Sequence, residues 1–180
     1  MNDSNLYTKI EMPEGVEVKL EGTTLHVKGP KGDISRPFAD PVLERKVSGN
    51  AVELSYLRDT KAQKRKLNST IAHVKNMIKG VNEGFTYTLK ICSGHFPMSV
   101  NLKNGVFEVK NFVGESVPRR LKIIEGVDVA VNGDDITVQA NNKEKAGQVA
   151  ASIEKLCKRP GFDKRIFQDG IYITAKPTRY

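Results

Sequence analysis

The sequence is poor in the residues from which metal centres and redox sites are built. It has two cysteines, Cys92 and Cys157, three histidines and no tryptophan. The cysteines lie far apart and form no Cys-x-x-Cys pair, so neither a disulfide framework nor a zinc knuckle is indicated, and both are expected to be buried thiols. Because no His-x-x-x-His or His-Glu pair occurs either, we expect no metal ion and no other cofactor.

Long hydrophobic runs are also missing. No stretch approaches the roughly 18 consecutive apolar residues that a membrane helix needs, and residues 1–5 do not form a basic region followed by an apolar one. A cytosolic protein without a membrane partner is therefore expected. Its 180 residues and 38% hydrophobic content are enough for one ordinary domain or two small ones with packed cores.

A catalytic constellation is equally hard to find. Cys92 and His95 place a thiol near an imidazole, but a Cys-His dyad usually joins residues that are distant in sequence, so a thiol hydrolase is the weakest of the alternatives. Residues 29–32 (Gly-Pro-Lys-Gly) lack the spacing of a phosphate-binding loop, and the Asp134-Asp135 pair is typical of a hairpin tip. We expect no enzymatic activity and no small-molecule substrate.

The abundant feature is positive charge, and it is unevenly distributed. Lysine and arginine number 29 against 21 aspartates and glutamates, a net charge of +8 with a pI near 9.5. Residues 58–79 hold seven basic side chains against Asp59 alone, and residues 155–180 hold seven against two acidic ones. The rest of the chain carries a small negative net charge. Such concentrated patches favour polyanionic partners.

The sequence also contains an internal repeat. A shift of 111 positions places residues 16–27 over residues 127–138, with apolar residues over apolar residues and Gly22 over Gly133. In both segments apolar residues alternate before and after a glycine-containing turn, which predicts a β-hairpin. Because any two hairpins share alternation and turn glycines, a chance likeness of two unrelated hairpins remains open.

Two amphipathic helices come after these hairpins. Leu67, Ile71, Val74 and Ile78 recur at three- and four-residue steps, which predicts a basic helix beginning at Asp59 or Thr60 and ending before Gly80. A second, shorter helix is predicted over residues 143–158, between the possible caps Asn141-Asn142 and the breaker Pro160-Gly161.

Strands outnumber helices in the rest of the chain. Asn104-Gly105 between two alternating runs is a strong hairpin signal. The further predicted strands are residues 34–37, 42–47, 51–56, 85–91, 99–103, 106–111, 121–124 and 171–174. The sequence therefore predicts an α+β protein of two similar domains related by duplication, each a small antiparallel sheet packed with one helix, over residues 1–80 and 81–180.

Five short stretches, in order along the chain, resemble one family, the large-subunit ribosomal protein numbered six, in its archaeal or eukaryotic form. They are residues 27–32 (Val-Lys-Gly-Pro-Lys-Gly), 76–85 (Asn-Met-Ile-Lys-Gly-Val-Asn-Glu-Gly-Phe), 95–97 (His-Phe-Pro), 111–115 (Asn-Phe-Val-Gly-Glu) and 167–172 (Phe-Gln-Asp-Gly-Ile-Tyr). The resemblance spans nearly the whole chain, and that family also has two similar domains. The absence of a long basic extension fits the archaeal form better.

The resemblance implies a structural, non-catalytic protein of the cytoplasmic ribosome. It implies binding to large-subunit ribosomal RNA near the sarcin-ricin loop and the base of the factor-recruiting stalk, beside neighbouring ribosomal proteins, with most RNA contacts in the C-terminal domain. The residues expected to contact RNA are Lys155, Lys158, Arg159, Lys164, Arg165, Lys176, Arg179, Tyr180 and, in the His-Pro element, His95. The bacterial Pro-Tyr-Lys-Gly-Lys-Gly pattern is missing around residues 157–165.

Other interpretations remain for these residues. Each basic side chain taken singly is as well explained as a solvated lysine or arginine. Tyr172, Tyr180, Phe162 and Phe167 are suited to stacking on unpaired bases, although core packing explains the two phenylalanines better. The alternative function is a non-ribosomal two-domain adaptor that binds acidic protein partners, with strand edges such as residues 106–111 as docking surfaces.

Overall fold

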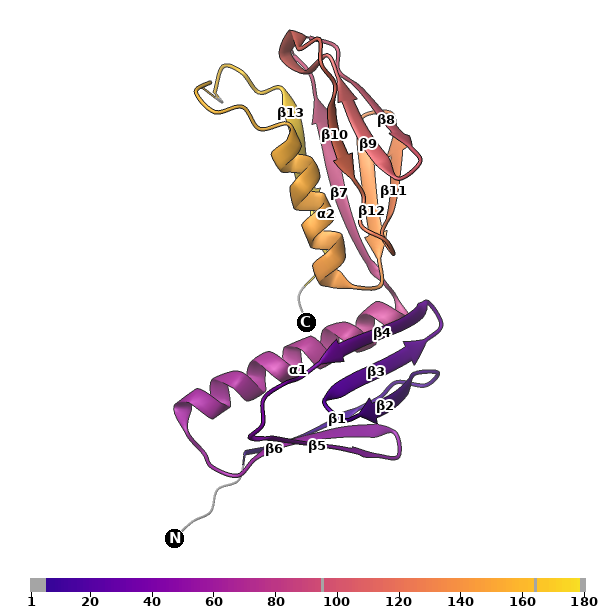
Figure 1. The fold of residues 1–180 in the computed structure, drawn as a ribbon, viewed down its shortest axis with the longest axis vertical. Coiled ribbons are helices and arrows are strands. Elements are labelled where there is room, and N and C mark those ends of the chain that lie inside the picture. The colour runs from indigo at the N-terminus through magenta and orange to yellow at the C-terminus, as the bar shows by residue number, and fades with distance from the viewer. Residues whose placement is uncertain (1–5, 95, 164, 179–180) are drawn as a thin grey trace. The chain divides into compact units, whose positions relative to one another are not determined.

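The computed structural model describes residues 6–94, 96–163 and 165–178. The chain forms two compact units that divide between Gly84 and Phe85, drawn in Figure 1. The first unit therefore extends a few residues past the expected limit at residue 80. Both units combine antiparallel strands with one α-helix, as the α+β prediction requires, but each contains two small sheets instead of one.

The described part of the first unit, from residue 6 on, contains six strands and the long helix α1. Its strands are β1 (Leu6–Glu11), β2 (Glu17–Glu21), β3 (Thr24–Gly29), β4 (Gly32–Pro37), β5 (Leu43–Ser48) and β6 (Ala51–Tyr56), and α1 spans Lys61–Asn82. The strands form two three-stranded sheets, in the orders β1-β6-β5 and β2-β3-β4. The helix packs against β3, β4 and β6, so that it covers strands of both sheets.

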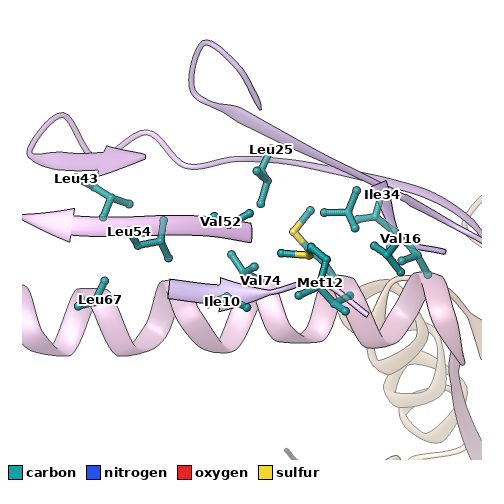
Figure 2. Packing of buried hydrophobic residues seen from close by; sticks show 14 of the residues in the cluster. Ile10, Met12, Val16, Leu25, Ile34, Leu43, Val52, Leu54, Leu67 and Val74 are labelled. Carbon is teal, nitrogen blue, oxygen red and sulfur yellow. The ribbon is translucent and has the colours of Figure 1, made fainter. Parts of the chain in front are cut away.

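The core of the first unit lies between the helix and the sheets. Figure 2 shows Leu67 and Val74 on the side of α1 that faces Val52 and Leu54 of β6. These four side chains are at most 3% exposed. The three- and four-residue spacing of apolar positions in α1 therefore has the predicted consequence, a buried stripe along one side of the helix.

The start of α1 was predicted correctly, but its end was not. Thr60 is the N-cap, and its hydroxyl oxygen accepts a hydrogen bond from the backbone N–H of Gln63. The helix continues past Gly80 because that glycine is buried and the following Val81 packs against Gly29. It ends at Asn82, and Gly84, just past the end, has a left-handed φ of 78° and donates its N–H to the carbonyl of Lys79.

Among the residues that the structure describes, the second unit contains seven strands, a short 3-10 helix and the helix α2. Its elements are β7 (Phe85–Cys92), β8 (Ser99–Lys103), β9 (Val106–Lys110), η1 (Phe112–Gly114), β10 (Arg119–Lys122), β11 (Asp128–Asn132), β12 (Asp135–Ala140), α2 (Lys143–Leu156) and β13 (Gly170–Ala175). The sheet orders are β10-β9-β8 and β11-β12-β7-β13. The predicted Asn104-Gly105 hairpin joins β8 to β9, with both turn residues at positive φ.

Helix α2 packs on the four-stranded sheet. It contacts β7, β12 and β13, and it also contacts β10 of the other sheet. Asn142 is the N-cap, as expected, because its side-chain oxygen accepts hydrogen bonds from the N–H groups of Glu144 and Lys145. The fully buried Ile153 of α2, Ile136 of β12 and Leu89 of β7 belong to one apolar cluster.

The duplication is real, but the 111-residue shift that suggested it was wrong. That shift superposes β2–β3, from the sheet β2-β3-β4, on β11–β12, from the sheet β11-β12-β7-β13. In topology, β1-β6-β5 corresponds to β7-β12-β11, and β2-β3-β4 to β8-β9-β10. A shift of 84 places β6 on β12, with identical hairpin register. Alternation and a turn glycine were too general to select the correct partner hairpin.

The first strand was not predicted at all. In β1 only Ile10 is buried and Leu6 is half-buried, while Tyr7 and Lys9 are exposed, so only two strongly apolar side chains carry its alternation. It is held by pairing with β6 along its whole length.

None of the described helices is long and apolar enough to cross a membrane.

Candidate nucleic-acid interface

The predicted RNA-contacting residues that the structure describes lie in the second unit, on the segment that runs from the end of α2 to just past β13. Lys155 is in the last turn of α2, Lys158, Arg159 and Arg165 come after it, and Lys176 comes directly after β13. Lys164, Arg179, Tyr180 and His95 lie outside the described residues. In Figure 1 this segment projects beyond the end of α2 as a yellow loop. We call residues 157–169 the basic loop.

The basic loop is organised by contacts among its own side chains. The Arg159 guanidinium carbon lies 4.2 Å from the centre of the Phe162 ring. That ring meets Phe167 edge to face, with 5.0 Å between ring centres. Phe162 is 38% exposed and Phe167 is half-buried, so neither belongs to the core. The core packing that seemed the better explanation for both phenylalanines is therefore wrong, because they pack within the loop.

Most of the cations of this segment face solvent. Lys155, Lys158 and Lys176 are exposed and, within the described part of the chain, make no ion pair. Arg165 is paired: its guanidinium donates to both carboxylate oxygens of Asp163, at 2.8 to 3.2 Å. This pairing lowers the pKa of the Asp163 carboxyl. The side chain of Arg165 is nevertheless 90% exposed, and it remains accessible to a phosphate.

The base of the loop is fixed by Arg119 of β10. Its guanidinium donates to both carboxylate oxygens of Glu115, at 2.6 and 2.7 Å, and to the carbonyl of Leu156 at 2.6 Å. The same group lies 4.4 Å from the centre of the Phe112 ring. Carbonyls at the end of a helix lack intrahelical donors, so Arg119 satisfies one of them at the point where the basic loop leaves α2.

The Arg119–Glu115 pair shifts the pKa of the carboxyl that it contains. The hydrogen bonds from Arg119 hold the pKa of the Glu115 carboxyl below its usual range, although partial burial opposes this shift. Beside the pair, burial raises the pKa of the Cys157 thiol to about 11, so this thiol is protonated at neutral pH. It behaves as the buried thiol that was expected. No group of three or more metal-ligating side chains occurs among the residues described.

The far end of the loop is tied to the sheet. The carboxylate of Asp169, a residue only 7% exposed, accepts a hydrogen bond of 2.7 Å from the backbone N–H of Gly94, just beyond β7. Glu154 of α2 accepts one from the backbone N–H of Ile173 in β13. The basic loop is therefore anchored at both ends, which reduces the conformational entropy that binding would otherwise cost.

A pocket of about 290 Å³ opens beside the loop. Its walls come from the end of α2, the loop, the start of β13 and the strained segment after β9, where Val113 has a φ of 49°. Arg159, Phe162, Phe167 and Tyr172 line it. Tyr172, at 36% exposure, presents an aromatic surface beside cations, as base stacking requires.

Sequence reasoning singled out cations of this segment but missed the residues that fix its base. Arg119 and Glu115 were not expected to take part in the interface, although Glu115 ends one of the family-like stretches and the two are four residues apart. The signal that would have identified Arg119 is its proximity to Leu156, 37 residues along the chain, and a single sequence does not contain it.

Comparisons with known proteins agree with the duplicated architecture. The model of the family described as "Ribosomal protein L6" matches residues 12–84 and again residues 96–170. The two matches start 84 positions apart, the same shift that superposes β6 on β12.

Whole-chain relatives give the same result. The large ribosomal subunit protein uL6 of Sulfurisphaera tokodaii is 41% identical over 177 residues, which cover 98% of this chain and 95% of that protein. The uL6 proteins of Methanobrevibacter smithii and Methanococcus vannielii are 42% and 43% identical over 168 residues, which cover 93% of this chain and 94% and 92% of theirs. The chain belongs to the ribosomal protein L6 family and is of the archaeal type.

Proposed function

We propose that the chain binds 23S-type ribosomal RNA near the sarcin-ricin loop and the base of the factor-recruiting stalk, and that it stabilises the RNA structure there. The second unit, which begins at Phe85, is the main RNA-binding domain. The observation that carries this proposal is the basic loop, which presents Lys158, Arg159 and Arg165 on a segment anchored at both ends. The non-catalytic role agrees with membership of a ribosomal protein family.

The chemistry of the loop suits a phosphate backbone. Lysine and arginine side chains that replace condensed counterions provide most of the affinity of a protein for RNA, and this contribution does not depend on sequence. The guanidinium of Arg165 is able to bind a phosphate bidentately. Tyr172 adds a surface on which an unpaired base can stack, so that backbone binding and base contacts are combined at one place.

The partners are inferred from the same position. Neighbouring ribosomal proteins at the stalk base are expected to contact the surfaces of the chain that RNA leaves open.

The adaptor alternative loses its suggested docking edge, because β9 is the central strand of β10-β9-β8 and is paired on both sides. The prediction that residues 106–111 offer a free edge was wrong, and no other described feature favours the adaptor.

The test measures binding of the full chain to a ribosomal RNA fragment that contains the sarcin-ricin region, over a range of salt concentrations. The variant Lys155→Gln/Lys158→Gln/Arg159→Gln removes three charges from the end of α2 and the loop. Its slope of log K against log salt is expected to be smaller than that of the wild type by about 2 to 3, if each cation meets one phosphate.

A matched variant controls for net charge. Lys103→Gln/Lys122→Gln/Lys145→Gln removes three exposed charges from β8, β10 and the first turn of α2, and it is expected to keep nearly the wild-type slope. Equal losses in both triple variants would show that only net charge matters. If the wild-type chain bound an unrelated RNA of equal length as tightly, the proposed location in the ribosome would be wrong.

A further inference from the structure

Helix α1 contains no acidic residue. Over its 22 residues it has six lysines and arginines and neither aspartate nor glutamate. Helix α2, in the equivalent place of the second unit, carries Glu144 in its first turn and Glu154 near its end. The basic character of α1 is therefore a property of this helix and does not come from the duplicated scaffold.

The charges lie on the side of α1 opposite to the core. The buried residues are Leu67, Thr70, Val74, Met77, Ile78, Gly80 and Val81. The exposed face consists of positions three or four residues apart, and its residues are Lys61, Lys64, Arg65, Asn68, Ala72 and Lys75. We call this surface, together with Arg58 just before the helix, the α1 basic face.

Some cations of α1 have partners within the unit. Lys66 is 3.0 Å from the carboxylate of Asp40, and Lys79 is 4.0 Å from that of Glu83. By contrast, Arg58, Lys61, Lys64 and Arg65 are exposed and form no ion pair or side-chain hydrogen bond with any residue that the structure describes.

The stability of the helix does not explain these four residues. Cations in the first turn face the positive end of the helix dipole, and like charges at i and i+4, such as Lys61 and Arg65, repel each other. In α2 the first turn contains Glu144 beside Lys143 and Lys145, whereas the first turn of α1 contains cations and no acidic residue. The first-turn charges of α1 therefore act against its own stability, and an anionic partner would reverse that cost.

We infer that the α1 basic face is a second RNA-binding surface, which contacts the phosphate backbone without reading sequence. This inference rests on the proposed RNA-binding function but concerns the unit to which that function assigns no contacts. From Lys61 to Lys75 a helix rises about 21 Å, enough to meet several phosphates along one RNA strand. Each unit would then hold the RNA through its own surface, so that two weaker contacts combine into a tighter one.

An RNA backbone fits this face better than an acidic protein does. Stable protein interfaces have a central cluster of apolar or aromatic side chains that provides most of the energy. The exposed positions of α1 between Lys61 and Lys75 are lysine, arginine, asparagine, serine, alanine and other small or polar residues, with no exposed aromatic or large aliphatic side chain. A surface of this composition gains binding energy from counterion release, the mechanism of backbone recognition.

The test compares the full-length wild type with three triple variants, and the probe is large-subunit ribosomal RNA transcribed in vitro. Lys61→Gln/Lys64→Gln/Arg65→Gln removes three cations from the α1 basic face. Lys9→Gln/Lys19→Gln/Lys46→Gln removes three exposed cations from β1, β2 and β5 of the same unit. Lys155→Gln/Lys158→Gln/Arg159→Gln alters the site of the proposed function.

The inference predicts that the α1 variant binds about tenfold or more weakly at physiological salt, with a slope of log K against log salt smaller by about 2. The strand variant is expected to keep wild-type values. The thermal midpoint of the α1 variant should equal or exceed that of the wild type, which separates lost binding from lost folding.

Three results would overturn the inference. If the α1 variant binds like the wild type while the basic-loop variant is impaired, the proposed function stands and the inference is wrong. If neither variant is impaired, both are wrong. If the α1 variant binds RNA like the wild type but no longer binds poly-glutamate, which the wild-type chain does bind, the face serves an acidic protein instead of RNA.

Discussion

The two units share one scaffold and differ in the segment after their helix. In the first unit α1 ends at Asn82, and the chain passes directly into β7 of the second unit. In the second unit α2 is succeeded by the basic loop and by β13, which adds a fourth strand to the sheet that corresponds to β1-β6-β5. The duplicated part therefore provides the two sheets and the helix of each unit. The candidate interface lies on a segment that only the second unit has.

The two helices show the same division between scaffold and interface. Both have a side-chain oxygen at the N-cap and a buried apolar stripe, as folding requires. Their charges differ, since α2 carries Glu144 in its first turn and Glu154 near its end, whereas α1 has no acidic residue and its first-turn cations oppose its dipole. Exposed charge that opposes local stability is a useful indicator of function, because the fold alone gives no reason for it.

The strongest test of this comparison removes the anchor that the first unit lacks. Arg119→Leu would leave the Glu115 carboxylate and the Leu156 carbonyl without their donor and would end the stacking on Phe112. Because hydrogen bonds to charged groups stabilise by roughly 1.5–3 kcal/mol, we expect a loss of about 2–3 kcal/mol of unfolding free energy, measured by urea denaturation. RNA binding should also weaken, although Arg119 itself is not expected to touch RNA.

Two further measurements separate the anchor from ordinary surface pairing. Arg120→Leu breaks a pair with Glu108 in which Arg120 is 68% exposed, and it should cost less than about 1 kcal/mol. The pKa of the Glu115 carboxyl is lowered in the folded state. Its contribution to the free energy of unfolding is therefore complete above the unfolded-state pKa, near 4.3, and is lost as the pH falls through the lower folded-state pKa. Arg119→Leu should therefore reduce the acid sensitivity of stability below about pH 5, and an unchanged pH profile would contradict the proposed anchor.

A second prediction compares the close packing of the helix in the two units. A Cβ at Gly29 would lie 2.8 to 2.9 Å from the side chain and carbonyl of Val81 in α1. Since backbone atoms cannot yield cheaply, Gly29→Ala should destabilise the first unit by about 1–3 kcal/mol. The measurement is the urea midpoint.

The matched change in the second unit is Gly147→Ala in α2. Its Cβ would meet the Tyr87 hydroxyl at 2.9 Å, the tip of a side chain that can rotate away. Alanine also favours the helix over glycine by roughly 1 kcal/mol, so the net change should be smaller than 1 kcal/mol in either direction. A larger loss at Gly147 than at Gly29 would show that α2, not α1, is the more rigidly packed helix.

Local features of the sequence were sufficient for most elements of the fold. The Asn104-Gly105 turn, the apolar spacing of Leu67 and Val74 and the caps Thr60 and Asn142 all act through near neighbours, and each was predicted. The end of α1 was not, because it depends on Val81 packing against Gly29. The anchoring role of Arg119 was not predicted for the same reason, since it depends on a residue far along the chain. Both features depend on contacts between segments that are distant in sequence, and local sequence patterns do not contain these contacts.

The smallest expected effects come from the acidic residues beside the two basic surfaces. Asp163 pairs with Arg165 in the basic loop, and Asp59 is the single acidic residue among residues 58–79. Asp163→Asn removes one negative charge from the loop and frees Arg165 for phosphate, while the asparagine oxygen can still accept the N–H of Arg165. RNA affinity should therefore rise about two- to fivefold at low salt, and this gain should vanish at high salt, because screening suppresses both attraction and repulsion.

Asp59→Asn makes the matched change beside α1 and should raise RNA affinity by a similar factor if the α1 basic face also binds RNA. It should lower helix stability by only a few tenths of a kcal/mol, because Asp59 lies before the N-cap near the positive end of the dipole. Filter-binding titrations of both variants at two salt concentrations measure these changes. If Asp163→Asn strengthens binding and Asp59→Asn does not, RNA is held by the added segment of the second unit alone, and the charges of α1 require another partner.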